Sequence, residues 1–576
     1  MFKHRTFYET ILNESPVYQT KKLDEISSVH ICLNSMGLSL DSNIKTSSEL
    51  TRYLNDNIDY GTFFKLMTDY KSVYLTNFNF LTFDVYQTLT AMHIARHLMF
   101  YKVCLSHKLY AKHCSEEMSN GQYRNSGWAN ARVLVLCPTR FHAYLWAHTI
   151  FKFTNLEAEN LDKLFEYRSD EADNIDVLSE SEHGLHMCKR VNSNPKSLDY
   201  INTFRGDSHD IFLLPIKIVN NKMNFNCSLE TASLIIASPI GLRLALVKNQ
   251  EKQNVVYEQN YNESDYDLLL LSSIEILVAS QVDVLEQQNA THLDKIIKLC
   301  NREPSSYCKN FCIDRLRKSY FQEDVPNAPI YLRQEIFLSG TKNSVILSNP
   351  LQNIRGYAQL FTYHGNYLLN LIRSTPTVNV ISVGEQAKKI SDDSGLFLMS
   401  ILEDEVYLTF YQHFIKEFHS QIVEDPVLLV IPNEVHYKPV KKLLKSGVST
   451  DNFQCVSEKH SLKTLQSRIA DLKAKTITIL VLSERFYYYH RNLLSGYKHL
   501  VFLEPPTNPF IFNDLFKQMN TDVTDSVANS YKIKPLCLIY WHTKYHYLEM
   551  ERIVGTAKIK SLLTKNSNTQ VFINEL

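Results

Sequence analysis

The chain has 576 residues, of which 44% are hydrophobic, and its 61 basic residues (Lys and Arg) balance its 61 acidic residues (Asp and Glu). A net charge of zero excludes the overall basic field that drives non-specific binding to nucleic acid, so any nucleic acid must be bound by a local patch. The length exceeds that of one ordinary domain, and the hydrophobic content suffices for large cores.

Cysteine usage and hydropathy predict a protein of a reducing intracellular compartment without a membrane span. The 11 cysteines are scattered along the chain, and the first residues lack an apolar signal core. No apolar run approaches the length of about 18 residues that a membrane-spanning helix needs.

The first half of the chain alternates short apolar runs with segments of helical periodicity. Residues 1–59 are polar and irregular, and we interpret them as a short, mostly helical N-terminal lead-in. Strands are predicted at 72–75, 132–137, 234–237, 276–279 and 335–338, and helices at 84–101 and 141–153. Residues 157–182 are rich in Asp and Glu, which favours an acidic insertion that forms a solvated helix or loop.

The same alternation starts again after residue 350. Strands are predicted at 378–381, 427–431, 477–482, 500–503 and 536–541, and helices at 406–418, 434–445 and 461–472. Strands separated by helices are typical of parallel α/β sheets. We therefore predict an α/β protein with two RecA-like parallel-sheet lobes, at residues 60–350 and 351–576.

Polar residues follow the predicted strands at the carboxyl ends, where open α/β sheets bind their ligands. An ATPase of this architecture needs two carboxylates there, one for magnesium and one for the attacking water. After the strand at 276–279 the chain instead has Ser280 and Gln281, and Asp283 is the one acid that remains. Without its partners, Asp283 is predicted to be a structural cap or hydrogen-bond partner.

Two further parts of an ATPase are absent from the sequence. No glycine is followed by Lys-Ser or Lys-Thr, as a phosphate-cradling loop requires. Residues 505–516, where an arginine finger would follow the strand at 500–503, contain no arginine. We predict no catalytic residues and no cofactor.

Four short motifs occur in the order in which DEAD-box RNA helicases carry P-T-R, T-P-G, D-E-A-D and S-A-T. They are Pro138-Thr139-Arg140, Ser238-Pro239-Ile240-Gly241, Ser280-Gln281-Val282-Asp283 and Ser339-Gly340-Thr341. Longer runs, including LIIASPIGLRLAL at 234–246, SERFYYYHRNLLSGYKHLVF at 483–502 and ERIVGT at 551–556, resemble one degenerate branch. This branch is the digestive organ expansion factor family, also called the U3 small nucleolar RNA-associated protein 25 family.

The resemblance implies a non-catalytic, DEAD-box-like assembly factor, or pseudo-helicase, of the small-subunit processome. It implies association with pre-rRNA, the U3 snoRNP and other processome proteins in the nucleolus of the nucleus, and a role in processing to 18S rRNA. No membrane and no small-molecule substrate are implied. The alternatives are an active ATP-dependent RNA helicase with divergent motifs and a generic protein-interaction scaffold.

The resemblance also implies an RNA-binding set. Its members hold the RNA backbone in DEAD-box proteins and correspond here to Thr139, Arg140, Ser238, Gly241 and Arg243. Capping of the following helices by Thr139 and Ser238 explains these residue types equally well.

Three other clusters contain residue types that can bind a ligand, a partner or a metal. The aromatic run at 486–491 favours packing or a protein partner over base stacking. Lysines 438, 441, 442 and 445 form a basic helix face, for which solvation is the commoner explanation. Cys300, Cys308, Cys312 and His292 lack the paired spacing of zinc ligands, so no metal is predicted.

Overall fold

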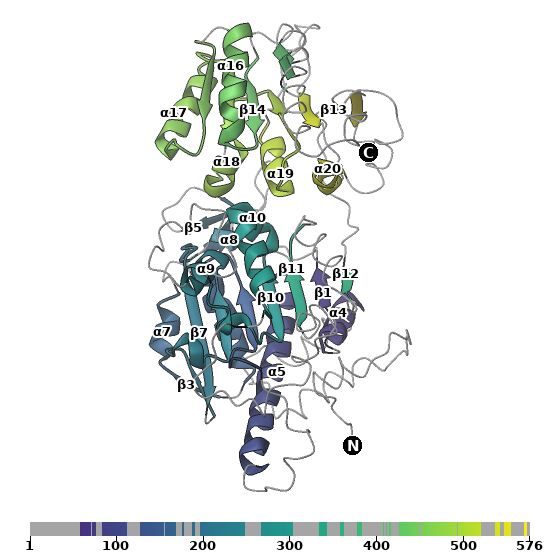
Figure 1. Cartoon of the computed structure of the whole chain (residues 1–576). Coiled ribbons are helices and arrows are strands. Elements are labelled where there is room, and N and C mark those ends of the chain that lie inside the picture. The colour runs from purple at the N-terminus through teal and green to yellow at the C-terminus, as the bar shows by residue number, and fades with distance from the viewer. Residues whose placement is uncertain are drawn as a thin grey trace. The chain divides into compact units, whose positions relative to one another are not determined.

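The structure is a computed structural model that describes most of residues 58–75, 83–111, 127–247, 266–304, 333–341, 358–361, 377–382, 425–519, 536–541, 546–554 and 569–572 and a few residues in 407–415, with short gaps. The predicted lead-in lies outside the described residues up to residue 57. The chain divides into two compact units (Figure 1). Unit 1 comprises Met1–Asp173 and Thr203–Tyr363, and unit 2 comprises Asn174–Asn202 and His364–Leu576.

Unit 1 is built on a sheet of nine described strands. In spatial order they are β12 (Ala358–Phe361), β1 (Ser72–Leu75), β11 (Gln334–Leu338), β10 (Ile276–Ser280), β2 (Val133–Leu136), β9 (Leu234–Ala237), β7 (Leu213–Val219), β8 (Lys222–Asn224) and β3 (Glu157–Glu159). The run from β12 to β9 is parallel, and β7 is antiparallel to both of its neighbours. The carboxyl ends of six strands therefore lie along one edge of this sheet.

Both faces of the unit 1 sheet are buried, as the unbroken apolar strands require. Alternate side chains of β2 enter opposite cores: Val133 and Val135 one, and Leu134 and Leu136 the other. The first core includes residues of α4 (Ile58–Thr68), α5 (Phe83–Ala111), α6 (Arg140–Lys152) and α7 (Leu161–Phe165). The second includes residues of α9 (Pro239–Leu246), the 3-10 turn η6 (Leu269–Leu271) and α10 (Val282–Leu299), and η3 (Leu229–Thr231) packs against it.

Unit 2 contains a second sheet, of seven described strands. Their order is β15 (Phe453–Val456), β16 (Ile479–Ser483), β14 (Val427–Ile431), β17 (His499–Phe502), β18 (Leu536–Trp541), β13 (Thr377–Ser382) and β19 (Thr569–Phe572). All neighbours pair in parallel except β13 and β19. The helices are η11 (Glu434–His436), α16 (Tyr437–Gly447), α17 (Leu462–Lys473), α18 (Glu484–His490), α19 (Pro509–Lys517) and α20 (His546–Val554).

A segment from the middle of the unit 1 sequence belongs to unit 2. It contains the antiparallel strands β4 (Ile175–Val177), β5 (Met187–Arg190) and β6 (Lys196–Ser197), followed by the start of α8 (Leu198–Phe204). Two contacts hold α8 within unit 2. Asp199 Oδ2 lies 3.0 Å from Arg491 Nη2, and the Tyr200 hydroxyl donates to the Tyr489 carbonyl over 2.9 Å.

The predicted α/β class with two parallel-sheet lobes is confirmed. Each predicted strand has a described counterpart, and those at 72–75, 234–237, 427–431 and 536–541 agree at both ends. The strands β3 to β8, β12, β15 and β19 were not predicted. The acidic insertion matches its prediction as a solvated helix or loop only in part: α7 is a short helix, but Glu157–Glu159 and Ile175–Val177 are short strands. Pairing of β3 with β8 at the sheet edge overrides the low strand propensity of Glu. No described helix is both long and apolar enough to cross a membrane.

Candidate functional site

The carboxyl end of β10 carries neutral side chains where an ATPase would hold metal. Ser280 is fully buried, and its hydroxyl has no hydrogen-bond partner among the described residues. Gln281 has a left-handed backbone (φ 53°, ψ 54°), and its buried Oε1 is also without a partner in the part of the chain that the structure describes. The serine hydroxyl and glutamine amide supply no negative charge for a magnesium ion and no base for an attacking water.

Asp283, the remaining acid, is engaged in bonds between neighbouring strand ends. It lies in the first turn of α10, and its Oδ1 accepts from the Gly340 amide over 3.0 Å and from the Ser339 hydroxyl over 3.5 Å. Ser339 and Gly340 follow β11, which pairs with β10. The carboxylate therefore ties the loop after β11 to the amino end of α10, a structural arrangement.

Thr139 and Arg140 lie at the start of α6, after β2. Thr139 is the N-cap: its Oγ1 accepts from the His142 amide and lies 2.7 Å from His142 Nδ1. Arg140 is partly exposed; its guanidinium lies 3.1 Å from Asp207 Oδ2 and over the ring of Tyr167, 4.5 Å from the centroid. A phosphate bound here would have to compete with Asp207 for the guanidinium.

Ser238 and Gly241 form the corresponding turn after β9. Ser238 is fully buried and caps α9, since its Oγ accepts from the Gly241 amide over 3.0 Å. A Cβ on Gly241 would lie 2.2 Å from the Phe212 carbonyl oxygen, so only glycine fits here. This close backbone approach explains the glycine without reference to a ligand.

Arg243 points into the packing between α9 and α10. It is only 4% exposed, and its guanidinium donates to the Tyr266 hydroxyl over 2.8 and 3.2 Å. It also donates to Nδ1 of His292, whose pKa is lowered to about 4 by burial and by the charge of Arg243. Among the five predicted RNA-binding residues, only Arg140 is more than slightly exposed. RNA binding by this set stays a prediction.

The possible zinc cluster gains no support in the described residues. His292 is the partner of Arg243, and Cys300 is a fully buried free thiol. Cys308 and Cys312 lie outside the described residues. No group of three His, Cys, Asp or Glu side chains suited to a metal occurs in the part of the chain that the structure describes.

In unit 2, a glutamate contacts the loop that follows β17, where an ATPase of this architecture would carry its arginine finger. Oε1 of the buried Glu484 accepts from the Thr507 hydroxyl over 2.7 Å and from the Thr507 and Asn508 amides over 2.9 and 3.3 Å. Burial raises the pKa of Glu484 to about 7, although the bonds from Thr507 and Asn508 act to lower it. The carboxyl group therefore shapes the loop that precedes α19.

Among the unit 2 arginines whose burial the structure describes, Arg491, which follows α18, is buried. Its guanidinium lies 2.7 Å from Asp514 Oδ2 and 3.0 Å from Asp199 Oδ2. Phe486, Tyr487 and Tyr488 are buried on the same helix, which agrees with packing for these three residues of the aromatic run, whereas Tyr489 is partly exposed. Arg491 is enclosed between carboxylates, and this environment does not fit a catalytic finger.

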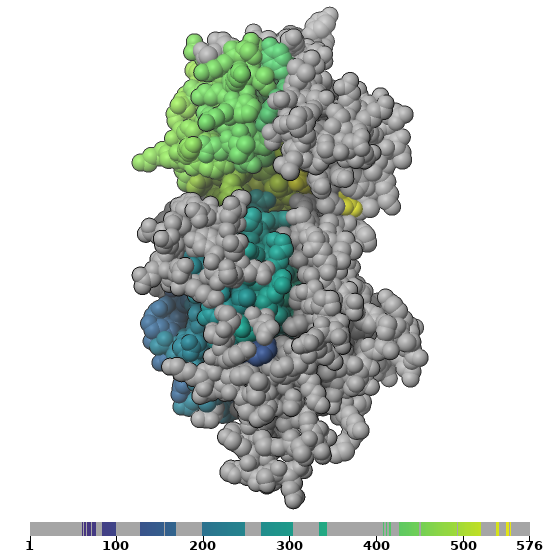
Figure 2. All heavy atoms as spheres, viewed as in Figure 1, coloured from purple at the N-terminus to yellow at the C-terminus, as the bar shows by residue number. Residues whose placement is uncertain are grey.

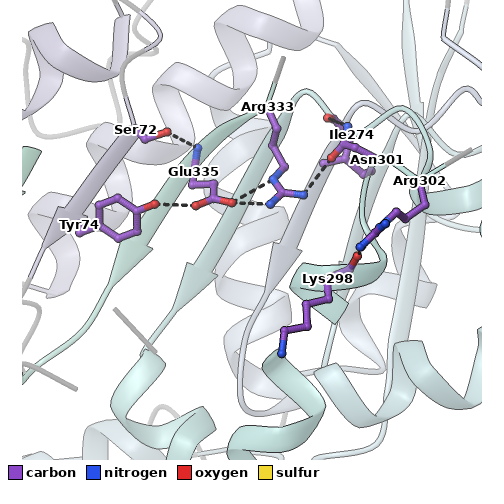
Figure 3. A network of polar contacts seen from close by, with 8 residues as sticks. All are labelled: Ser72, Tyr74, Ile274, Lys298, Asn301, Arg302, Arg333 and Glu335. Atoms are coloured by element: carbon purple, nitrogen blue, oxygen red, sulfur yellow. Dashed lines mark hydrogen bonds and ion pairs between the residues drawn. The ribbon is translucent and has the colours of Figure 1, made fainter. Parts of the chain in front are cut away.

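A charged network that the sequence did not reveal lies at the opposite, amino edge of the unit 1 sheet (Figure 3). Glu335 accepts from the Tyr74 hydroxyl over 2.5 Å and from Arg333 Nε over 3.1 Å, and Arg333 Nη1 donates to Asn301 over 3.0 Å. Next to it, Arg132 Nη1 lies 3.0 Å from Glu275 Oε1.

These buried charges have one feature in common that the sequence does display. Arg132, Glu275 and Arg333 each stand directly before the first residue of a central strand. Charges at such positions are usually solvated, and only the assembled sheet brings them into register. The network is remote in the sheet from the carboxyl edge, so its role is structural.

Two family models match this chain. The family model described as "UTP25, NTP hydrolase-like domain" matches residues 70–358, half of the chain, and that described as "Utp25, C-terminal domain" matches residues 399–572.

Individual relatives agree with these matches. A "U3 small nucleolar RNA-associated protein 25" of Vanderwaltozyma polyspora is 24% identical over 82% of this chain and 61% of its own length. The protein of that name in Schizosaccharomyces pombe is 25% identical over 86% of this chain and 69% of its own length. The chain thus spans about three fifths of the length of some of these relatives.

Among solved structures, S. cerevisiae Dbp5 bound to RNA and ADP BeF3 covers 93% of this chain at 8% identity, with a TM-score of 0.25. A DEAD box protein from Methanococcus jannaschii covers 96% at 10% identity, with a TM-score of 0.23. With such low scores, the fold assignment rests on the strand order described above. The family matches over both halves show that this chain belongs to the Utp25 family.

Proposed function

We propose that this protein is a ribosome-biogenesis factor, a non-catalytic, DEAD-box-like component of the small-subunit processome. In this role it associates with pre-rRNA, the U3 snoRNP and other processome proteins in the nucleolus, and it is required for processing to 18S rRNA. The printed name of the relatives, a U3 small nucleolar RNA-associated protein, supports the U3 association.

One observation supports the non-catalytic part of the proposal above all others. At the carboxyl end of β10, Ser280 and Gln281 are buried neutral residues, and Asp283 is bonded to Gly340 and Ser339. Phosphoryl transfer depends on positioned charge, with metal-binding and water-positioning carboxylates at this edge of the sheet. In this proposal the protein keeps the fold of a DEAD-box ATPase but lacks the carboxylates for phosphoryl transfer, because a fold does not by itself determine a function.

Co-sedimentation with pre-ribosomal particles tests the proposed role. In cells that express a tagged full chain, the protein is expected to migrate with large pre-ribosomal particles on a sucrose gradient and to co-precipitate U3 RNA. Depletion is expected to lower 18S rRNA while 25S or 28S rRNA is maintained. A tagged protein that stays at the top of the gradient and precipitates no U3 RNA would favour a scaffold unrelated to ribosomes.

A further inference from the structure

The outer face of α16 carries an uninterrupted positive charge. This helix of unit 2 (Figure 1) has the sequence YKPVKKLLKSG, with four lysines and no acid. On the inner face of the helix, Val440 and Leu444 are buried in the core of unit 2. Lys438, Lys442 and Lys445 are exposed and follow one another at intervals of four and three residues. These three residues, here called the lysine stripe, extend for about 10 Å along one side of the helix.

The fourth lysine does not belong to the stripe. Lys441 is half-buried; its ammonium group lies 5.3 Å from the centroid of the Tyr437 ring and donates to the Tyr437 hydroxyl over 3.4 Å. The structure thus divides a set that looks uniform in the sequence into three exposed charges and one packed charge.

The stripe lacks acidic partners within the described part of the chain. None of its three lysines forms an ion pair there, and the nearby Glu434 is engaged with Lys459 over 2.5 Å. By contrast, α17 has an acidic partner for one of its cations, since Arg468 lies 3.2 Å from Asp471. Like charges three and four residues apart destabilise a helix, and a chain of zero net charge has acids available to relieve them. The stripe is therefore a local concentration of charge rather than a result of basic composition.

The chemistry of the stripe fits phosphate better than protein. Lysine ammonium groups are compact charges on flexible stems, which bind phosphates without reading bases. The exposed residues of α16 other than the lysines are Ser446 and Gly447. Protein interfaces are depleted in lysine and are anchored by aromatic or apolar side chains, and the exposed face of α16 offers none. In Figure 2 the green part of unit 2, to which α16 belongs, lies at the surface.

We propose that the lysine stripe of α16 binds the sugar-phosphate backbone of RNA independently of base sequence. This surface belongs to unit 2 and is separate from the turns after β2 and β9. The inference rests on the proposed function, since it supplies the RNA contact of a processome factor. It makes no use of nucleotide chemistry.

Salt-dependent binding of a labelled RNA to the full chain tests the inference. The probe is a fluorescein-labelled single-stranded RNA of mixed sequence, and its affinity is measured by anisotropy over a series of KCl concentrations. The variant K438Q/K442Q/K445Q is expected to weaken binding on the order of 10- to 100-fold near 0.1 M salt. It is also expected to reduce the slope of log K against log salt by about 2, because each lost phosphate contact contributes about 0.7. The loss should be equal for RNAs of different sequence.

A matched variant removes the same charge elsewhere in unit 2. K463Q/K473Q/K475Q neutralises three exposed lysines in and just after α17. It should leave the affinity within about twofold of the wild type and the slope within about 0.5, less than the contribution of one phosphate contact. Circular dichroism of both variants checks that the helices are intact.

The remaining outcomes separate this inference from the proposed function. If the wild type binds RNA and co-sediments with particles while the stripe variant binds RNA equally well, the inference is overturned and the proposed function stands. If the stripe variant keeps RNA binding but leaves the particles, the partner of the stripe is an acidic protein and the inference again fails. A wild-type chain that neither binds RNA nor co-sediments overturns both.

Discussion

Arg333 and Glu335 form an ion pair that lies almost wholly inside unit 1. Their side chains are 1% and 3% exposed, and Glu335 also accepts from the Tyr74 hydroxyl. Burial, and then the charge of Glu335, raises the pKa of Tyr74 well above its ordinary value, so Tyr74 stays a neutral donor. A buried pair of this kind adds little net stability, but the loss of one partner leaves an uncompensated charge.

The variant Arg333→Met is therefore expected to lower the free energy of unfolding of unit 1 by about 3–5 kcal/mol. Urea unfolding, followed by the fluorescence of Trp128 and Trp146, measures this change. The matched control is Arg302→Met, which removes a partly exposed arginine that donates to the Lys298 carbonyl and should cost less than about 1 kcal/mol. Equal effects of the two substitutions would show that the buried network has no special role.

Glu484 gives unit 2 a dependence on pH. Its pKa in the folded protein is about 7, above the ordinary value of 4.5 in the unfolded chain. Between these values the folded state holds a proton that the unfolded state has lost, so stability declines as pH rises. The contribution is fully present below pH 4.5 and is lost once pH passes about 7.

The variant Glu484→Gln keeps an oxygen acceptor for Thr507 and Asn508 but cannot ionise. We expect the stability of the wild type relative to this variant to fall by up to about 3 kcal/mol between pH 4.5 and 7.5, given about 1.4 kcal/mol for each pKa unit. Hydrogen exchange of peptides in 479–517 at several pH values reports this difference. A constant difference across this range would exclude titration of Glu484.

At the scale of elements, the start of α8 belongs to unit 2, although the residues just before 174 and just after 202 in the sequence belong to unit 1. Asp199 shares Arg491 with Asp514, and Arg491 and Asp514 are both nearly inaccessible to solvent. The arginine has a left-handed backbone (φ 38°), a conformation that surrounding contacts must stabilise in a non-glycine residue.

We expect Asp199→Asn to loosen α8, which keeps the bond from Tyr200 to the Tyr489 carbonyl, while leaving α18 and α19 intact, because Arg491 keeps its bond to Asp514. Arg491→Met should disturb all three helices, since it leaves Asp514 buried without a cation. Hydrogen exchange of the three helices measures this graded response. The exposed pair on α17 provides the control, and Arg468→Met should alter none of them. A uniform response to both substitutions would contradict the proposed order of contacts.

The elements that the sequence predicted well share a local physical signal. The strands at 234–237 and 427–431 are unbroken apolar runs, and such runs are typical of strands buried on both faces of a parallel sheet. The edge strand β3 and its neighbour β8 carry Glu, Lys and Asn and depend on pairing with distant residues, so composition alone did not find them.

The candidate site was predictable in residue type but not in geometry. The missing carboxylates at Ser280 and Gln281 are visible in the sequence, and so is the choice between capping and binding at Thr139 and Ser238. The burial of Arg243 against Tyr266 and His292 is not, because these residues are 23 and 49 positions away along the chain. Long-range contacts of this kind decide whether an arginine is available to a ligand.

At the scale of the whole molecule, the proposed loss of ATPase chemistry depends on several parts together. A phosphate cradle, two carboxylates and an arginine finger each contribute orders of magnitude to phosphoryl transfer. The full chain is therefore expected to show no magnesium-dependent ATP turnover above background, with or without RNA. Restoring the two acids alone, as S280D/Q281E, should produce no activity, because the other parts remain absent.

Asp283→Asn completes this experiment because it separates a catalytic from a structural carboxylate. An asparagine oxygen can still accept from the Gly340 amide, so the variant should keep the fold of unit 1 and the background rate of the wild type. A substantial RNA-stimulated rate in the wild type that disappears in Asp283→Asn would instead establish an active helicase with divergent motifs. The substitution tests the chemistry independently of particle association, since a non-catalytic factor should remain with pre-ribosomal particles after the change.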